Sequence, residues 1–271
     1  MPAKPKPLLR QNGELRRDGV WNWTLPAWVT KLPDGRVVNV CPSAGACKDY
    51  CYARNGTYLF PKVKEAHQRN LMMTLDEPEE WQERMLSELA AKKFRPSGEP
   101  RFPEDRDRLI LDEWTQGWMD SGGIAVRIHD SGDFYSDDYL MRWAEIARQV
   151  DDILFYAYTK EVSRVKRMVG EEGFPPNFRV IFSLGGVEDH LLDPDEDRHA
   201  EVFPDLVSLA DAGYTDQEEN DLYCVLLDTT RVGIPANNIP AFKKRMGHKT
   251  FGQIEAEKGR RKTSVQRGIA A

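Results

Sequence analysis

The fold is decided by residues 124–169, which read IAVRIHDSGDFYSDDYLMRWAEIARQVDDILFYAYTKEVSRVKRMV. The apolar run at residues 124–128 predicts a strand, and residues 136–150 repeat apolar side chains at helical spacing. The alternation then recurs, with a second apolar run at residues 153–158 and a short helical pattern at residues 161–169. Strands that alternate with helices indicate parallel βα units joined by right-handed crossovers.

The same signals extend to both sides of this stretch. Short β-prone runs predict three more strands, at residues 36–40, 178–184 and 222–227. Helical spacing predicts further helices at residues 58–74, 78–94 and 202–210. Irregular connections are expected at residues 95–122 and 188–197. Five strands are too few for a complete eight-unit barrel, so the predicted fold class is α/β, a partial parallel (β/α) barrel or an open sheet.

Charge divides the chain into three predicted segments. Residues 1–36 carry seven Lys or Arg and three acidic residues, residues 241–271 carry nine and two, and the rest carry 22 and 39. We expect a basic extension over 1–35, an α/β barrel-like domain over 36–240 and a basic tail over 241–271. Because the acidic body repels phosphate, nucleic acid or a host protein is expected to bind only through these ends, which otherwise are solvated termini.

The apolar pattern argues against a membrane protein and against export. No run of about 18 apolar residues occurs, and the start, Met-Pro-Ala-Lys-Pro-Lys-Pro, lacks the apolar stretch of a signal peptide. The chain has 271 residues, of which 40% are hydrophobic and 10% aromatic, which suits one globular domain. We therefore expect a cytoplasmic protein with no membrane partner.

Three of the four cysteines, Cys41, Cys47 and Cys51, lie within eleven residues directly after the strand predicted at 36–40. A disulfide framework does not explain three crowded thiols in a cytoplasmic chain. Structural zinc takes four ligands, usually from two short pairs of cysteines, and this chain has no second pair. An iron–sulfur cluster held by three cysteines leaves one iron open and needs none. We predict an iron–sulfur cluster, with zinc or unligated thiols as alternatives.

The remaining cysteine, Cys224, decides whether such a cluster is open or closed. In a strand at 222–227, Cys224 would lie about 13 Å below the carboxyl end, at about 3.3 Å per residue. We therefore expect Cys224 to be a buried thiol and the cluster to keep an open iron, which binds and polarises a small molecule. With Cys224 as a fourth ligand, the cluster would instead carry electrons or serve a structural role.

Polar residues follow the other predicted strands, where parallel sheets gather functional groups. These residues are His129, Asp130, Ser131 and Asp133, then Thr159 and Lys160, then Ser183. We expect them to form one polar rim, and all except Ser131 to line a cavity facing the cysteine loop. His129 and Lys160 are the catalytic candidates, and the other five would bind a cofactor. A histidine satisfied by local hydrogen bonds and a lysine in a plain salt bridge are the simpler alternatives.

Four motifs combine in a characteristic order along the chain. They are VWNWTLPA at residues 20–27, CPSAGACKDYCYAR at 41–54, VRIHDSGDFY at 126–135 and FYAYTK at 155–160. Over about residues 20–190, this combination resembles the gene product 88 family of actinobacteriophages. The resemblance implies a phage protein in the host cytoplasm and a cofactor bound by the cysteines.

A more distant resemblance rests on the cysteine loop that follows the first predicted strand and on Tyr50, the aromatic residue before Cys51. These features are similar to radical S-adenosylmethionine enzymes, in which a partial barrel carries a three-cysteine loop after its first strand. The loop here is Cys-x5-Cys-x3-Cys rather than that superfamily's Cys-x3-Cys-x2-Cys, and no Gly-Gly-Glu follows the second strand. The resemblance implies a [4Fe-4S] cluster whose open iron binds S-adenosylmethionine or a similar small cofactor or substrate. A flavin beside the cluster, and a closed-cluster or zinc-stabilised binding module acting on a host partner, are the alternatives.

Overall fold

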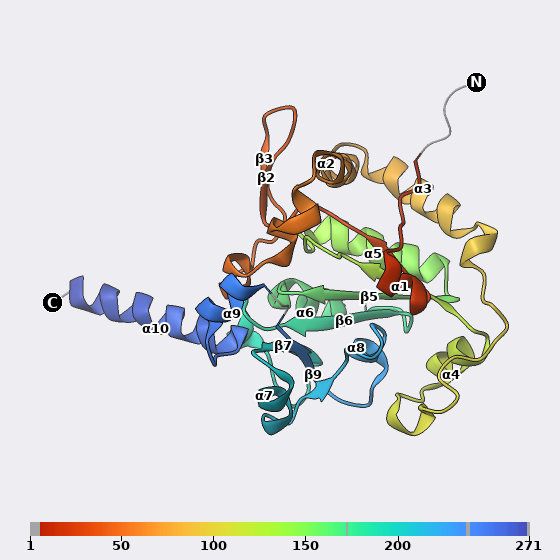
Figure 1. The fold of residues 1–271 in the computed structure, drawn as a ribbon. Coiled ribbons are helices and arrows are strands. Elements are labelled where there is room, and N and C mark those ends of the chain that lie inside the picture. Colours follow the sequence, from red (N-terminus) through yellow and green to blue (C-terminus); the bar gives the residue numbers. More distant parts are fainter. Residues whose placement is uncertain (1–5, 172, 237–238, 270–271) are drawn as a thin grey trace.

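A seven-stranded sheet, in which every pair of neighbouring strands is parallel, forms the centre of the protein (Figure 1). The computed structural model describes residues 6–171, 173–236 and 239–269. In spatial order the strands are β1 (Val20–Trp23), β4 (Ile124–Ile128), β5 (Ile153–Thr159), β6 (Phe178–Ser183), β7 (His199–Phe203), β9 (Arg231–Pro235) and β8 (Thr215–Asp216). Two further strands, β2 (Val29–Lys31) and β3 (Val37–Asn39), form a separate antiparallel hairpin. The α/β class is thereby confirmed.

Helices connect these strands and surround the sheet. The α-helices are α1 (Gly13–Arg17), α2 (Pro61–Asp76), α3 (Pro78–Leu89), α4 (Glu113–Asp120), α5 (Asp137–Gln149), α6 (Val162–Glu171), α7 (Leu206–Asp211), α8 (Tyr223–Leu226), α9 (Pro240–Met246) and α10 (Phe251–Ile269). The short 3-10 helices are η1 (Ala46–Asp49), η2 (Tyr52–Arg54), η3 (Gly56–Leu59), η4 (Lys92–Phe94), η5 (Arg106–Arg108) and η6 (Asp189–Leu191). Local sequence sets where several begin: the Ser136 and Asp205 side chains accept the first free N–H groups of α5 and α7.

The two faces of the sheet are covered by two hydrophobic cores, because alternate strand residues point to opposite faces. On one face, Val126 and Phe155 pack with residues of α3, α5 and α6. On the other face, Ala125 and Leu154 pack with residues of α4 and α8. Figure 1 shows α3 and α5 above the sheet and α8 below it. The two cores thus cover the faces of the sheet, and the loops that carry polar residues lie at its carboxyl edge.

The central βα units match the sequence prediction closely. The structure confirms the elements predicted at residues 124–128, 136–150, 153–158, 161–169 and 178–184, with bounds that differ by at most two residues. The helices predicted at 58–74 and 78–94 are also present, as α2 and α3. Residues 95–122 are mostly irregular as predicted but contain α4, which Asp112 caps by accepting the Thr115 N–H at 2.9 Å.

The prediction for the start of the sheet is wrong. The run at 36–40 does form a strand, β3, but β3 pairs with β2 in the hairpin and not with the parallel sheet. The first sheet strand is β1, in which Val20 pairs with Ala125 of β4. The sheet thus begins inside the segment predicted to be an extension, residues 1–35, and Leu25 of that segment is fully buried.

The prediction for the end of the sheet is also wrong. Residues 222–227 contain the helix α8, in which every residue is buried. A continuous apolar run of this length does not distinguish a strand from a buried helical turn. The helix predicted at 202–210 begins only at Leu206, because β7 continues to Phe203 and Pro204 and Asp205 separate the two elements. β2, β7, β8 and β9 were also not predicted.

The sheet is not a closed barrel within the described residues, since β1 and β8 form its two edges and do not pair with each other. A partial barrel with the architecture of radical S-adenosylmethionine enzymes stays a prediction. Among the described residues, no helix is both long enough and apolar enough to cross a membrane.

Candidate functional site at the cysteine loop

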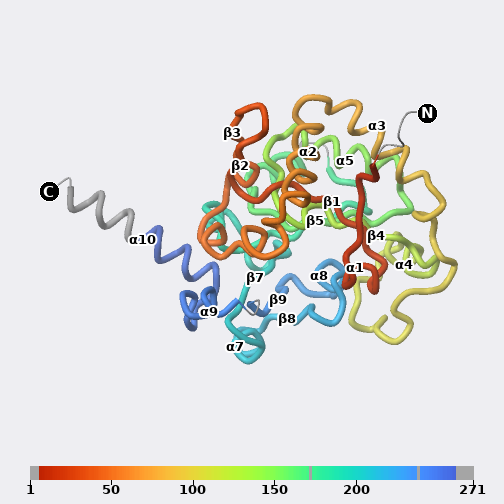
Figure 2. The backbone as a smooth tube through the Cα atoms, turned by 45° about the horizontal axis from the view of Figure 1, so that its top comes forward, coloured from red at the N-terminus to blue at the C-terminus, as the bar shows by residue number. Residues whose placement is uncertain are grey.

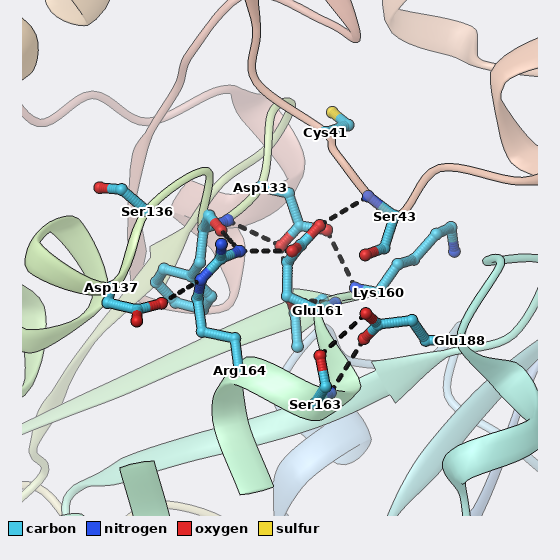
Figure 3. Close-up of polar contacts among 12 residues, drawn as sticks. Cys41, Ser43, Asp133, Ser136, Asp137, Lys160, Glu161, Ser163, Arg164 and Glu188 are labelled. Atoms are coloured by element: carbon cyan, nitrogen blue, oxygen red, sulfur yellow. Dashed lines mark hydrogen bonds and ion pairs between the residues drawn. The ribbon is translucent and has the colours of Figure 1, made fainter. Parts of the chain in front are cut away.

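The cysteine loop, residues 41–51, is tied to the segments that follow β5 and β6. The Ser43 N–H donates to Glu161 Oε1 at 2.8 Å, directly after β5. The Cys47 N–H donates to the Gly185 carbonyl at 3.2 Å, and the Ser43 carbonyl accepts the Val187 N–H at 2.9 Å, both just after β6. The loop therefore lies over the carboxyl edge of the sheet, and Figure 3 shows it above Asp133 and Glu161.

The thiols of Cys41, Cys47 and Cys51 form no disulfide and are partly buried. Burial raises the pKa of all three, and the charge of Asp133 and the other two thiols raise the pKa of Cys41 further. The Lys160 ammonium acts in the opposite direction on the pKa of Cys47 and Cys51. The three thiols are therefore close enough to influence each other's ionisation. Buried thiols in this state lose their protons readily only when a metal takes the place of the proton.

The donor set fits a cluster. In the described residues, no three His, Cys, Asp or Glu side chains converge on one point where a single ion would bind. In an iron–sulfur cluster each cysteine binds a different iron, so the thiolates surround a larger group than a single ion. Three partly buried thiols with Lys160 beside two of them suit a group of negative charge.

Four of the predicted rim residues meet beneath this loop. Asp133 accepts the Lys160 N–H at 2.9 Å and the Thr159 hydroxyl. The Lys160 ammonium donates to the Ser183 carbonyl and hydroxyl, both at 2.7 Å, and to the Leu184 carbonyl at 3.1 Å. Burial raises the pKa of Asp133. Because all three ammonium donors of Lys160 have acceptors, this lysine acts here as a fixed positive charge.

His129, predicted as a catalytic residue, is enclosed in the hydrophobic core and does not join the rim. Its φ angle is +68°, and its ring packs on Phe134 and Tyr139 with centroid distances of 4.8 and 5.5 Å. Its Nε2 lies 3.0 Å from the Tyr139 hydroxyl. Burial lowers its pKa to about 3, so the imidazole is neutral. The simpler alternative, a histidine satisfied by local hydrogen bonds, holds only at Nε2, because the buried Nδ1 has no hydrogen-bond partner among the described residues.

Asp130 and Ser131 connect the loop region to its surroundings. The hydroxyl of Tyr52 donates to the Asp130 carbonyl, and that of Tyr58 to the Asp130 carboxylate. Asp130 therefore fastens the chain that leaves Cys51. The Ser131 hydroxyl donates to the Leu25 carbonyl at 2.5 Å, and its carbonyl accepts the Leu25 N–H at 3.0 Å. Cofactor binding by these two residues stays a prediction.

Cys224 is a buried thiol, as predicted, but the strand register that led to this prediction is wrong because Cys224 lies in α8. Its thiol donates to the Asp221 carbonyl at 2.9 Å, and burial raises its pKa. Cys224 belongs to the core on one face of the sheet, whereas Cys41 packs against the core on the other face. The thiols of Cys41 and Cys224 therefore lie on opposite faces of the sheet.

Sequence reasoning missed the C-terminal cover of the loop. The Tyr50 ring packs on Phe242 of α9 and Phe251 of α10, with centroid distances of 6.0 and 5.3 Å. The Lys258 ammonium pairs with the Asp49 carboxylate at 2.5 Å. The described part of the basic tail is thus docked and not simply solvated. Aromatic residues within that tail were the available signal, since a solvated segment does not need large aromatic rings.

Glu161 was also missed. One carboxylate oxygen holds the Ser43 N–H of the loop and the other pairs with Arg164, and Figure 3 shows Glu161 beside Asp133. Burial, followed by the charge of Asp133, raises the pKa of Glu161 to about 7. Its position next to Lys160 in the sequence gave no indication of this role.

Glu201 of β7 is a second buried carboxylate with a raised pKa, and its effect on stability can be measured. Its side chain is buried, accepts the Gly252 N–H at 3.0 Å, and has its pKa raised by burial from 4.5 to about 7. Ionisation is therefore harder in the folded chain, and stability is lost as the pH rises through this range. At about pH 8, Glu201→Gln is expected to raise the free energy of unfolding by up to about 3 kcal/mol. Below about pH 4.5 the two proteins should match.

Urea denaturation at the two pH values measures this difference. The exposed Glu196→Gln variant is the matched control and should show the pH dependence of the unsubstituted chain. An equal loss of stability with rising pH in the Glu201→Gln protein would contradict the assignment.

Comparison with known proteins gives one family and one distant relative. The sequence profile of the family described as Gene product 88 matches residues 6–266. The Gene 88 protein of Mycobacterium phage D29 is 27% identical over 130 residues, which is 48% of this chain and 45% of the phage protein. The aligned region therefore spans less than half of that relative. No solved structure matches the chain.

Proposed function

The chain belongs to the gene product 88 family of bacteriophage proteins, and we propose that it is an iron–sulfur protein with enzymatic chemistry. In this proposal Cys41, Cys47 and Cys51 bind a [4Fe-4S] cluster with one open iron, and that iron binds S-adenosylmethionine or a similar small cofactor. A closed cluster, a zinc-stabilised binding module and an iron–sulfur flavoprotein are the alternatives that the experiments below distinguish.

One observation carries the proposal: three mutually interacting thiols lie over the carboxyl edge of a parallel sheet, and the fourth lies in the opposite core. Functional groups of parallel α/β proteins gather at this edge. Three cysteines without a fourth leave one iron free for a ligand. The loop lies in the connection between β1, the first strand of the sheet, and β4, with the β2–β3 hairpin directly before it.

The chain's own residues have distinct tasks in this proposal. When bound, the cluster supplies an electron and a Lewis-acidic iron. Lys160 places a fixed positive charge near Cys47 and Cys51, which favours their thiolate forms. Asp133 holds the backbone of Lys160, and Glu161 holds the backbone of Ser43, so both carboxylates position the loop relative to β5.

Composition analysis tests the cluster directly. Protein purified without oxygen is expected to be brown and to contain iron and acid-labile sulfide in equal amounts, about four of each per chain. Zinc without iron would support the zinc-stabilised module, and an extracted flavin would support the flavoprotein. Neither metal in freshly purified protein, with no gain on reconstitution with iron and sulfide, would refute a metal centre.

The open iron has its own test. Adding S-adenosylmethionine to the reduced protein is expected to change the electron paramagnetic resonance spectrum of the cluster, because a ligand binds the iron that lacks a cysteine. Adenosine, which lacks the methionine part with its α-amino and carboxylate groups, is the control and should leave the spectrum unchanged. An unchanged spectrum, together with loss of the cluster in Cys224→Ser, would favour the closed cluster.

A further inference from the structure

We propose that a basic surface beside the cysteine loop binds single-stranded nucleic acid. This basic surface consists of Trp28, Lys48, Arg54, Arg245 and Lys258. The inference goes beyond the proposed cluster and does not require it, since it rests on charge and exposed aromatic rings.

The first part of the basic surface surrounds Trp28. The Lys48 ammonium and the Arg54 guanidinium lie over the Trp28 ring, at 5.6 and 4.8 Å from its centroid. Arg54 also donates to the Lys48 carbonyl at 3.0 Å. Trp28 has a φ angle of +51°, which is rare for a bulky residue. Two cations are thus held side by side next to Cys47 and Cys51.

The second part comes from the C-terminal helices and borders the same turn. Arg245 of α9 donates to the Asp49 carbonyl, and its guanidinium lies 4.5 Å from the Tyr50 ring centroid. Lys258 of α10 pairs with the Asp49 carboxylate. Because Asp49 follows Lys48 directly, these contacts join both parts, which together contribute four cations; Asp49 pairs with Lys258, and the Glu255 carboxylate of α10 lies near Gly45 of the loop.

The long-range charge distribution favours a polyanion at this place. Residues 241–271 carry nine basic and two acidic residues, whereas the central part of the chain has a large excess of acids. Figures 1 and 2 show α10 projecting from the body at the side of α9. A polyanion is therefore repelled by most of the molecule and attracted to this side.

Side chains in the segment after the loop and in α10 favour a single strand over a membrane or a duplex. Tyr52 and Phe60, in the segment after the loop, are 40% and 58% exposed. Bases of a single strand stack on such rings, whereas the bases of a duplex are stacked on each other. A helix that binds a membrane surface needs a bulky apolar face, but residues 258–269 contain only Val265 and Ile269 as aliphatic residues.

Fluorescence anisotropy with a labelled single strand of about 20 nucleotides tests the proposal on the full chain. Binding is expected at low salt and should weaken as salt rises. The triple variant Lys48→Gln/Arg54→Gln/Lys258→Gln is expected to bind at least about tenfold more weakly. Its slope of log affinity against log salt should be smaller by about 2, because each phosphate contact to a single strand contributes about 0.7.

Matched controls separate this surface from general charge effects. Arg16, Lys92 and Arg95 are exposed and belong to α1 and the segment after α3, on the opposite side of the molecule from α10 (Figure 1). Their triple replacement by Gln should leave affinity unchanged. The iron content of the Lys48→Gln/Arg54→Gln/Lys258→Gln protein should equal that of the unsubstituted chain, so that loss of the cluster and loss of binding are distinguishable.

Three results would overturn the proposal. One is the absence of binding at low salt by a protein whose thermal unfolding is normal. Another is an equal loss of affinity in both triple variants, which would show that only net charge matters. The third is binding to phosphatidylserine vesicles without binding to the single strand, which would identify a lipid surface as the partner.

Discussion

The Cys47→Ser protein, purified without oxygen, is expected to be colourless and to have lost its cluster iron. A serine hydroxyl is a poor ligand for cluster iron, which thiolates bind. With only two cysteines remaining in the loop, two irons would lack a cysteine. Cys41→Ser and Cys51→Ser should behave in the same way. Iron and sulfide analysis together with the visible absorption spectrum measures the loss.

Cys224→Ser is the matched control for these variants. Cys224 is fully buried in the core on the other face of the sheet; its thiol donates to the Asp221 carbonyl, and its own carbonyl accepts Arg198. The Cys224→Ser protein should therefore keep its iron and its colour. Full iron content in all three loop variants would refute the cysteine loop as the ligand set.

Trp143→Ala is expected to lower the free energy of unfolding by about 3–5 kcal/mol, because it removes a large buried side chain and leaves a cavity. Trp143 of α5 is fully buried, and its ring lies 5.2 Å from that of Trp81 and 6.1 Å from that of Phe155. The residue thus links the first core across α3, α5 and β5. Chemical denaturation measures the change.

The exposed Gln149→Ala variant in the same helix serves as the control and should change stability by no more than about 0.5 kcal/mol. A loss below about 1 kcal/mol in Trp143→Ala would contradict the role of this ring as a central part of the core.

The sequence allowed the central βα units to be predicted because each element there shows its own period. In α5, Trp143 and its apolar neighbours recur at helical spacing, and a polar loop separates this helix from each flanking strand. β1 was missed because it has four residues and its partner is β4, about a hundred positions away in the chain. α8 was misread because a fully buried helical turn is apolar on all sides.

The part of the site that could be predicted is the part that residue types indicate locally. Clustered cysteines and polar residues after strands identified the loop, Asp133 and Lys160 from local signals. The orientation of His129 depends on its positive φ angle, which its residue type does not indicate. The Tyr50 contacts with the C-terminal helices depend on tertiary packing alone.

The cover formed by α9 and α10 has a consequence for the order of synthesis. Asp49 and Lys258, which pair across this contact, are 209 positions apart in the chain. At about 5–20 residues per second, the ribosome needs about 10–40 s to make the residues between them. During that interval the three cysteines have emerged while the helices that later flank them do not yet exist. A cluster delivered then reaches the loop without displacing any part of the finished protein.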